Sequence, residues 1–289
     1  MSRLFLQEMY WRAGPDLSNA TDLLKMNIQA KKVVDQEMKN ESLTESFLQY
    51  FTVDLATTQA QKESVYNIRY HVYCEEFKYE PMDRFPDKLE YDACDDHSLH
   101  CLVTHISSGK PAGCVRLIQT TDDNCDILPF EEVCAESLDY EFIRGLNLDR
   151  KTVCEISRLA VDSAFRRRAD ETQTRFGGVD AMDCSHHEQR AFGLIAVAGL
   201  LGATALSDLT GRSNAFAMME SFLPRLLKRS GIIFQQVGEK IEYHGIRAPF
   251  FITTQSMQVN IHPDLKELYE AIYEQIKQSY ADQQAKTTN

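Results

Sequence analysis

Short apolar runs alternate with longer amphipathic segments along most of this chain. Five segments have the pattern typical of strands: 47–57, 97–120, 153–162, 213–219 and 232–254. Four segments repeat apolar residues at helical spacing: 58–77, 186–209, 221–231 and 263–281. Because helices are interspersed with strands, the pattern favours a layered α/β arrangement on a mixed sheet.

Turn and cap residues refine these segments. The turn signal SSGKPAG splits 97–120 into a predicted hairpin, and 232–254 is long enough for two strands. Ser221 is placed to cap the third helix, and Gly231 is placed to end it. We expect residues 121–150 to form an irregular acidic connection.

The chain is long enough for one large domain or two small ones. Residues 1–44 are polar and helix-prone, which predicts a peripheral arm. No linker divides residues 45–258, so we expect one α/β domain there, followed by a helix and tail over 259–289.

The segment 153–168, VCEISRLAVDSAFRRR, combines a strand pattern with charged residues. A strand that is apolar on both sides is typically buried on both faces. Glu155 and Arg158 are therefore costly inside it unless they are paired or used. Residues 166–168 are three arginines at the exit of the strand, where guanidinium groups suit a phosphate-bearing ligand.

Composition narrows the function classes. A formal net charge of −12 argues against general nucleic-acid binding. The eight cysteines are scattered without a CxxC motif, and the spacing of Cys94, Cys101, Cys184 and His186 is too irregular for a predicted zinc site, so we expect no metal. The apolar run 191–206 is shorter than a membrane span and suits a core helix. We expect reduced thiols and a soluble, cytoplasmic protein without an integral membrane segment.

Further charged residues occur in apolar surroundings. Arg69 lies on the apolar face of the helix over 58–77, Arg116 lies in the second strand of the hairpin, and Asp92 and Asp95 close an acidic loop. The simplest interpretation is a set of structural ion pairs. Their order along the chain suggests a second interpretation.

Five motifs together resemble the acyl-homoserine-lactone synthases. They are RYHVYCEEFKY, the DACD of 92–95, VRLIQT, the PF at 129–130 and EISRLAV. The matching positions are Arg69 with Val72, Tyr73 and Tyr79; Asp92 with Asp95; Arg116 through Thr120; and Glu155 with Arg158. Gln119 and Tyr79 depart from the family, which has a proline and a tryptophan at these positions.

The second half resembles another branch of the same superfamily. FAMMESFLPRLLKRSGI and VGEKIEYHGIRAPFF look like the acyltransferases associated with the PEP-CTERM/exosortase system, which are related to the N-acyl amino acid synthases. Together the resemblances cover about residues 45–255. They imply the GNAT fold, a three-layer α/β/α sandwich on a central mixed, mostly antiparallel sheet, with an acyl thioester donor and an amine acceptor.

The segment after the central strand departs from ordinary GNAT enzymes, which have a glycine-rich pyrophosphate loop there. In AFRRRADETQTRFGG the only glycines are Gly177 and Gly178. We therefore favour the phosphopantetheine of an acyl carrier protein over coenzyme A, with no tightly bound cofactor. The predicted donor-binding residues are Arg166, Arg167, Arg168, Leu159, Ala160 and Val161. A solvated turn is the alternative for the three arginines.

The resemblance also implies roles in catalysis. Glu155 is the candidate that removes a proton from the attacking amine, because an ammonium group is not nucleophilic. The alternative for Glu155 is a salt bridge. Arg158 and the four residues Arg69, Asp92, Asp95 and Arg116 complete the predicted catalytic set. The predicted substrate-binding residues are Tyr73, Tyr79, Phe130, Met218 and Met219; plain core packing is the alternative for the two methionines.

The sequence therefore favours an N-acyltransferase that moves a fatty acyl group to an amino acid or similar small amine, with acyl carrier protein as partner. One alternative is an acyl-homoserine-lactone synthase that uses S-adenosylmethionine. Another is a non-catalytic GNAT-like module that binds an acyl carrier or lipid.

Overall fold

A computed structural model describes residues 42–120, 127–166, 188 and 191–287. In these ranges eight strands form one sheet, in the order β1-β2-β3-β4-β5-β8-β6 with β7 also on β8. The strands are β1 (Phe51–Leu55), β2 (Ser98–His105), β3 (Pro111–Gln119), β4 (Val153–Val161), β5 (Asn214–Glu220), β6 (Gln235–Gln236), β7 (Ile241–Glu242) and β8 (Ile246–Thr253). Every pairing is antiparallel except β4 with β5.

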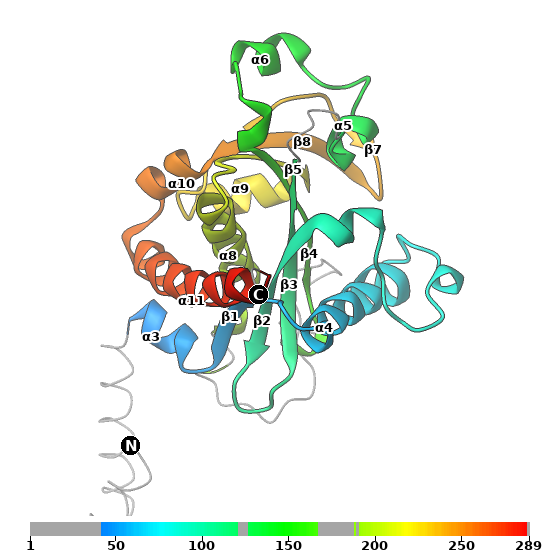
Figure 1. Ribbon diagram of the computed structural model, residues 1–289. Coiled ribbons are helices and arrows are strands. Elements are labelled where there is room, and N and C mark those ends of the chain that lie inside the picture. The colour runs from blue at the N-terminus through cyan, green and yellow to red at the C-terminus, as the bar shows by residue number, and fades with distance from the viewer. Residues whose placement is uncertain (1–41, 121–126, 167–187, 189–190, 288–289) are drawn as a thin grey trace, which may run out of the picture. The chain divides into compact units, whose positions relative to one another are not determined.

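Helices flank this sheet (Figure 1). They are α3 (Leu43–Leu48), α4 (Gln59–Arg69), α5 (Pro129–Val133), α6 (Tyr140–Gly145), α8 (Ile195–Leu209), α9 (Phe222–Lys228), α10 (Thr254–Asn260) and α11 (Pro263–Thr287). Figure 1 shows α8 and α11 to one side of the central strands and α4 to the other. The predicted layered α/β fold on a mixed, mostly antiparallel sheet is confirmed.

The α8 helix packs unusually close to the sheet because its sequence is rich in small residues. A Cβ atom added to Gly202 would lie 3.0 Å from Val53 of β1 and 3.1 Å from the sulfur of Cys101 of β2. The main apolar core lies between the sheet and the layer formed by α8 and α11. The sequence interpretation of the 191–206 run as a core helix is correct for α8.

The α4 helix begins with a reciprocal cap and ends in a wider turn. Thr58 accepts a hydrogen bond from the backbone of Gln61, and the Gln61 side chain accepts one from the backbone of Thr58. From Tyr70 to Glu76 the helix continues with π-type hydrogen bonding, which often occurs at functional sites. This wider turn places Tyr73 against β4.

The β4 strand departs from a regular ladder on both sides. Cys114 of β3 pairs with Ala160 while Arg116 pairs with Ser157, so β4 carries one extra residue at a β-bulge. Within the bulge Arg158 has a φ angle of 54°, a left-handed conformation that is uncommon outside glycine. On its other edge, β4 pairs with β5 from Val153 to Glu155, and the two strands separate beyond Glu155.

Some local predictions differ from the structure. The connection predicted to be irregular, 121–150, contains α5 and α6 in its described part. Ser221 has helical backbone angles and makes no side-chain cap, so that prediction is wrong. Gly231 does end the segment, with a φ angle of 79° and no room for a side chain, because an added Cβ would lie 2.0 Å from the carbonyl oxygen of Asn260.

Other predicted boundaries differ from those in the structure or are not tested by it. Three strands, not two, occupy 232–254, because a hairpin turn at Tyr243–Gly245 separates β7 from β8. Residues 1–41 lie outside the described part, and the predicted boundaries at 44 and 258 stay predictions. Among the described residues no helix is both long and apolar enough to cross a bilayer.

Candidate active site

Arg69, at the end of α4, is held by two carboxylates in a fully buried position. Its Nε donates to Glu90, and its two terminal nitrogens donate to Asp95 at 2.7 and 3.0 Å. Neither Arg69 nor Glu90 exposes more than 1 % of its surface. A paired guanidinium of this kind is a rigid structural anchor, and breaking it would leave an uncompensated buried charge.

Arg116 of β3 extends this pair into a network. It donates to Asp92 at 2.7 Å, to Asp95 at 3.0 Å and to the Ser157 hydroxyl of β4 at 3.1 Å. Asp92 caps the 3₁₀ turn Ala93–His97, and Asp95 accepts a hydrogen bond from the Asp92 backbone. The acidic loop is therefore folded around the two arginines.

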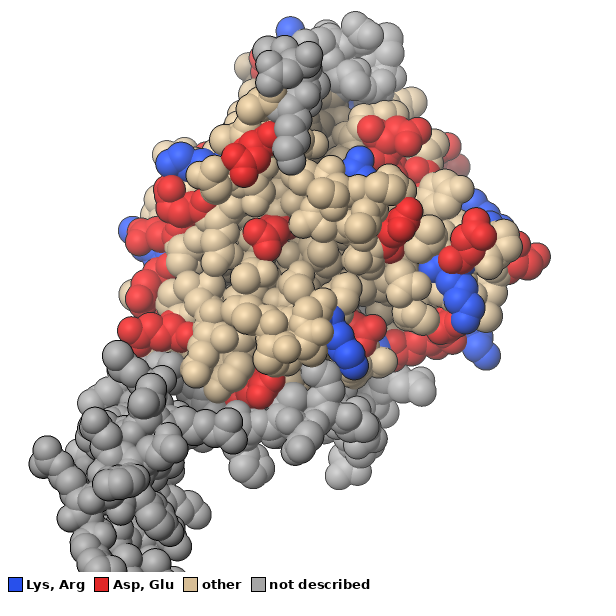
Figure 2. Space-filling view, turned by 60° about the horizontal axis from the view of Figure 1, so that its bottom comes forward, with Lys and Arg blue, Asp and Glu red and all other residues tan. Residues whose placement is uncertain are grey.

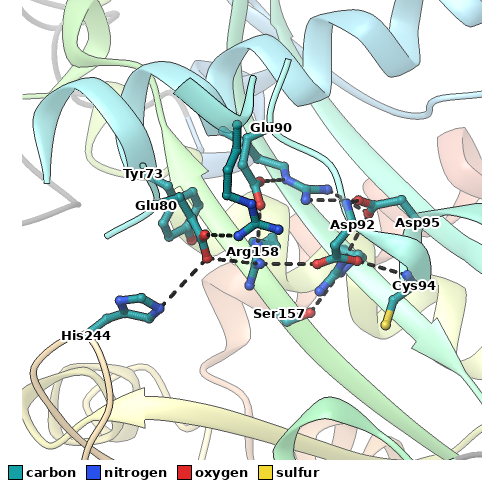
Figure 3. Close-up of polar contacts among 12 residues, drawn as sticks. Tyr73, Glu80, Glu90, Asp92, Cys94, Asp95, Ser157, Arg158 and His244 are labelled. Carbon is teal, nitrogen blue, oxygen red and sulfur yellow. Dashed lines mark hydrogen bonds and ion pairs between the residues drawn. The ribbon is translucent and has the colours of Figure 1, made fainter. Parts of the chain in front are cut away.

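Arg158 reaches the same network from the β4 bulge. Its Nε donates to Glu90 and its terminal nitrogen to Asp92, both at 3.2 Å, and Glu80 lies 4.0 Å away (Figure 3). With a side chain that is 21 % exposed, Arg158 is the most accessible of the three arginines in the network. Its guanidinium also lies over the Tyr73 ring.

Close pairing keeps the acidic members of the network ionised. Burial alone would raise the pKa of Asp95, but the adjacent Arg69 and Arg116 outweigh it and hold that pKa well below its usual range. The pKa of Glu90 is lowered for the same reason, with Arg69 and Arg158 as the charges that outweigh its burial. Asp95 and Glu90 therefore remain negatively charged at neutral pH, next to the arginines that pair with them.

Glu155 of β4 lies where β4 and β5 separate. It is 4 % exposed, and its carboxylate accepts a hydrogen bond from the Phe130 backbone of α5 at 2.9 Å. Burial raises the pKa of Glu155 from 4.5 to about 7, against smaller opposing effects from Phe130, Arg116 and Arg158. A carboxylate with this pKa exchanges protons near neutral pH, as a general base requires.

A cavity opens beside Glu155 in the gap between the strands. The central strands contribute Glu155 through Leu159 from β4 and Ala217 through Met219 from β5. The remaining wall is formed by Tyr73, Pro129, Phe130, Val133, Leu200, Leu223, Phe234, Tyr243 and Arg247. A second, apolar cavity shares Ile156, Leu200 and Phe234 with the first and reaches Met257 of α10.

The predicted substrate-binding residues gather at this cavity, with one exception. Tyr73, Phe130, Met218 and Met219 line it. Tyr73 also donates to the Leu159 carbonyl of the bulge at 2.9 Å. Tyr79 is not part of the wall; it lies next to it, with its ring 5.2 Å from that of His244 and 6.2 Å from that of Tyr73.

The predicted donor-binding residues are less close together. Leu159 lines the cavity, whereas Ala160 and Val161 are buried in the ladder between β4 and β3. Arg166 is also buried, where it pairs with Glu76 and lies over the Phe77 ring. Burial lowers the pKa of Arg166 to about 10. Arg167 and Arg168 lie outside the described residues.

The sequence interpretation missed two acidic members of the network and one basic wall residue. Glu80 and Glu90 belong to the polar, proline-containing segment 78–96, where helical or strand periodicity gives no indication of burial. Arg247 of β8 is separated from every motif used above, and only the sheet brings it to the cavity. The one sequence feature that could have indicated Glu90 as a network member was its closeness to Asp92 and Asp95.

Comparison with known proteins agrees with this architecture. The Acetyltransferase (GNAT) domain matches residues 68–174. This segment holds the network, Glu155 and the bulge. No curated protein matches the chain.

Three solved structures of other proteins resemble this chain. A TofI structure in a ternary complex with an inhibitor and MTA is 17 % identical over 74 % of this chain and 99 % of its own, with a TM-score of 0.51. The CoA-dependent acyl-homoserine lactone synthase MesI is 20 % identical over 77 % and 95 %, with a TM-score of 0.48. FeeM, an N-acyl amino acid synthase from uncultured soil microbes, is 12 % identical over 75 % and 97 %, with a TM-score of 0.48. At 17 % identity the TofI structure shows a likeness of fold alone, and with the GNAT domain match it confirms the predicted GNAT-like fold.

Proposed function

We propose that this protein is an N-acyltransferase that moves a fatty acyl group from a thioester to the amine of an amino acid or similar small molecule. The observation that carries the proposal is Glu155, a buried carboxylate with a pKa of about 7 in the wall of a largely apolar cavity. The match of residues 68–174 to a GNAT acetyltransferase domain supports acyl transfer as the reaction class.

The reaction follows from the surroundings of β4. Glu155 takes a proton from the acceptor ammonium, directly or through water, and the neutral amine attacks the thioester carbonyl. The carbon–nitrogen bond forms, the carbon–sulfur bond breaks, and the thiol leaves with a proton. Backbone N–H groups of the bulge, where Arg158 and Leu159 have no register partner on β3, are our candidate donors for the oxyanion.

In this proposal the arginine–carboxylate network has a positioning role. Arg69 and Arg116 are almost completely buried and donate to carboxylates of the chain itself, so we assign them to holding the acidic loop and β4. In this proposal the two arginines, which the sequence analysis placed in the catalytic set, act indirectly. Arg158 is the member that also lines the cavity.

The apolar part of the cavity suits the acyl chain. Met218 and Met219 form one wall, and methionine side chains adapt to flexible apolar ligands. The second cavity, which begins at Ile156, Leu200 and Phe234, extends the apolar path toward α10. A fatty chain in this path would be removed from water next to the reacting carbonyl.

A basic face on α9 favours acyl carrier protein as the donor. The helix directly follows β5, and its buried Leu223 lines the cavity. Its outer surface exposes Arg225, Lys228 and Arg229, with the exposed apolar residues Phe222 and Leu226 among them. On the face shown in Figure 2, acidic side chains are scattered among neutral ones and basic side chains are fewer. With a formal net charge of −12, a localised basic patch is suited to an acidic carrier. This patch replaces the buried Arg166 in the donor hypothesis.

The test is a product assay with purified protein, fatty acyl-carrier-protein donors of several lengths and a mixture of the twenty amino acids. We expect N-acyl amino acids by mass spectrometry, with a rate that rises through about pH 7 as Glu155 ionises. Glu155→Gln should lower kcat about 100-fold or more, and the exposed control Glu136→Gln should not. Unchanged turnover in Glu155→Gln would remove Glu155 from the base role.

The same assay separates donors and competing products. Lys228→Glu should raise KM for the acyl-carrier-protein donor about 10-fold and leave KM for acyl-CoA unchanged. A preference for acyl-CoA that Lys228→Glu does not alter would contradict the carrier proposal. With S-adenosylmethionine present, a homoserine lactone product would support the synthase alternative, and a complete lack of thioester consumption would support a non-catalytic module.

A further inference from the structure

Arg247 of β8 is a basic residue of the cavity that the mechanism above does not use. It is 7 % exposed and lines the same cavity as Glu155, Arg158 and Met218. It is not one of the three arginines in the network, which lie on α4, β3 and β4. A buried charge in a largely apolar wall is energetically costly unless it is paired or serves a function.

Aromatic rings hold Arg247 in place. Its guanidinium lies 5.3 Å from the ring centre of Tyr79 and 5.8 Å from that of Tyr243. One terminal nitrogen donates to the His244 carbonyl at 3.1 Å, and a carboxylate oxygen of Glu220 lies 4.0 Å away. Contacts over ring faces cover the plane of a guanidinium, and the planar N–H fork of an arginine matches the geometry of a carboxylate.

The hairpin between β7 and β8 contributes both Tyr243 and Arg247 to this arrangement. His244 and Gly245 have φ angles of 51° and 93°, and Tyr243 donates to the Gly245 carbonyl. His244 lies 3.9 Å from Glu80 and against Tyr79, which connects the hairpin to the segment after α4 (Figure 3). Two segments that are distant in sequence thus meet around Arg247.

Charge balance distinguishes Arg247 from the network. There, three guanidinium groups face four carboxylates, those of Glu80, Glu90, Asp92 and Asp95, so an anionic ligand would meet net repulsion. Arg247 faces the carboxylate of Glu220 at 4.0 Å, so the charge there is balanced. An anion in this cavity therefore meets less repulsion near Arg247 than near Arg69 or Arg116.

We propose that Arg247, held by Tyr79 and Tyr243, binds the carboxylate of the acceptor and selects α-amino acids over amines without a carboxylate. The proposal rests on the proposed function and adds the group that recognises the acceptor. A carboxylate bound by Arg247 and an amine directed to Glu155 would orient the acceptor across the cavity, because both side chains line it.

The experiment compares each accepted amino acid with its carboxamide, which keeps the amine and side chain but has no negative charge. We expect the wild-type protein to prefer the acid by at least 10-fold in kcat/KM. Arg247→Gln should lower kcat/KM for the acid about 30-fold and change that for the amide less than 3-fold. Arg247→Lys should fall between them, and the exposed control Arg144→Gln should match the wild-type protein.

The outcomes separate this inference from the proposed function. Wild-type turnover without preference for the acid would overturn the role of Arg247, even if the variants fail to fold. An equal loss for acid and amide, or a raised KM for the donor alone, would overturn it too and assign Arg247 to the fold or to the donor phosphate. Absence of any acyl transfer by the wild-type protein would overturn the proposed function itself.

Discussion

Asp95 and Glu155 are both buried carboxylates near arginines, yet their pKa values shift in opposite directions. Asp95 accepts hydrogen bonds directly from Arg69 and Arg116. Glu155 accepts one from a backbone amide, and its environment is dominated by the apolar cavity. The difference teaches that direct pairing, more than the mere presence of arginines, decides whether a buried acid stays charged.

Under the proposed function, the same contrast gives the two regions different roles. The charges of the network pair with one another, and this pairing stabilises the position of β4 and the acidic loop. The cavity leaves Glu155 with a high pKa and therefore able to accept a proton. Loss of a network residue should damage the fold, whereas loss of a cavity residue should damage the reaction.

The largest expected effect comes from breaking the network at its centre. Arg69→Met would leave Glu90 and Asp95 buried without their main countercharge, and should lower the free energy of unfolding by about 3–5 kcal/mol. Chemical denaturation at pH 7 would measure it. Arg84→Met is the control, because its 59 % exposed side chain pairs with Glu80 in solvent and should contribute less than about 1 kcal/mol. Equal effects of the two variants would contradict a buried structural network.

A smaller effect, of opposite sign, is expected at Glu155. Between pH 4.5 and about 7 the unfolded chain loses the Glu155 proton while the folded protein retains it, so stability falls as pH rises through this window. Above pH 7 Glu155→Gln should therefore be more stable than the wild-type protein, by up to about 3 kcal/mol. Below pH 4 the two proteins should converge.

Urea denaturation from pH 4 to pH 8 would check this difference, with the exposed Glu267→Gln as control. The network has the opposite dependence: because the pKa values of Asp95 and Glu90 are lowered, their contribution is lost as pH falls below about 4. A Glu155→Gln difference that stays constant across the pH range would mean that Glu155 has an ordinary pKa in the folded protein.

The smallest effect is expected from reshaping the apolar wall. Met218→Trp would fill space next to Cys134 and should shift the acyl preference toward shorter chains by about 10-fold in relative kcat/KM. Competition between long- and short-chain donors, followed by mass spectrometry, would measure it. Met82→Trp, at a 48 % exposed position, is the matched control. An unchanged preference would place the acyl chain elsewhere.

Much of the architecture followed from local pattern. The hairpin of β2 and β3, the central strand β4 and the helices α4, α8 and α11 occur where apolar spacing predicted them. The predicted cap of α9 was wrong because Ser221 has helical backbone angles and makes no side-chain cap. The short strands β6 and β7 are too brief for a periodic signal, and they exist because β8 offers them an edge.

The sequence by itself determined the alternation of strands and helices, and it marked Arg69, Asp92, Asp95 and Arg116 as charged residues in a meaningful order. Only the tertiary structure decided which of them are paired and which line a cavity. It paired Arg69 with Glu90, buried Arg166 against Glu76, and brought Arg247 to the cavity that contains Glu155. The reason is physical: burial and pairing depend on segments far apart in the chain, and those distances exist only after the sheet has formed.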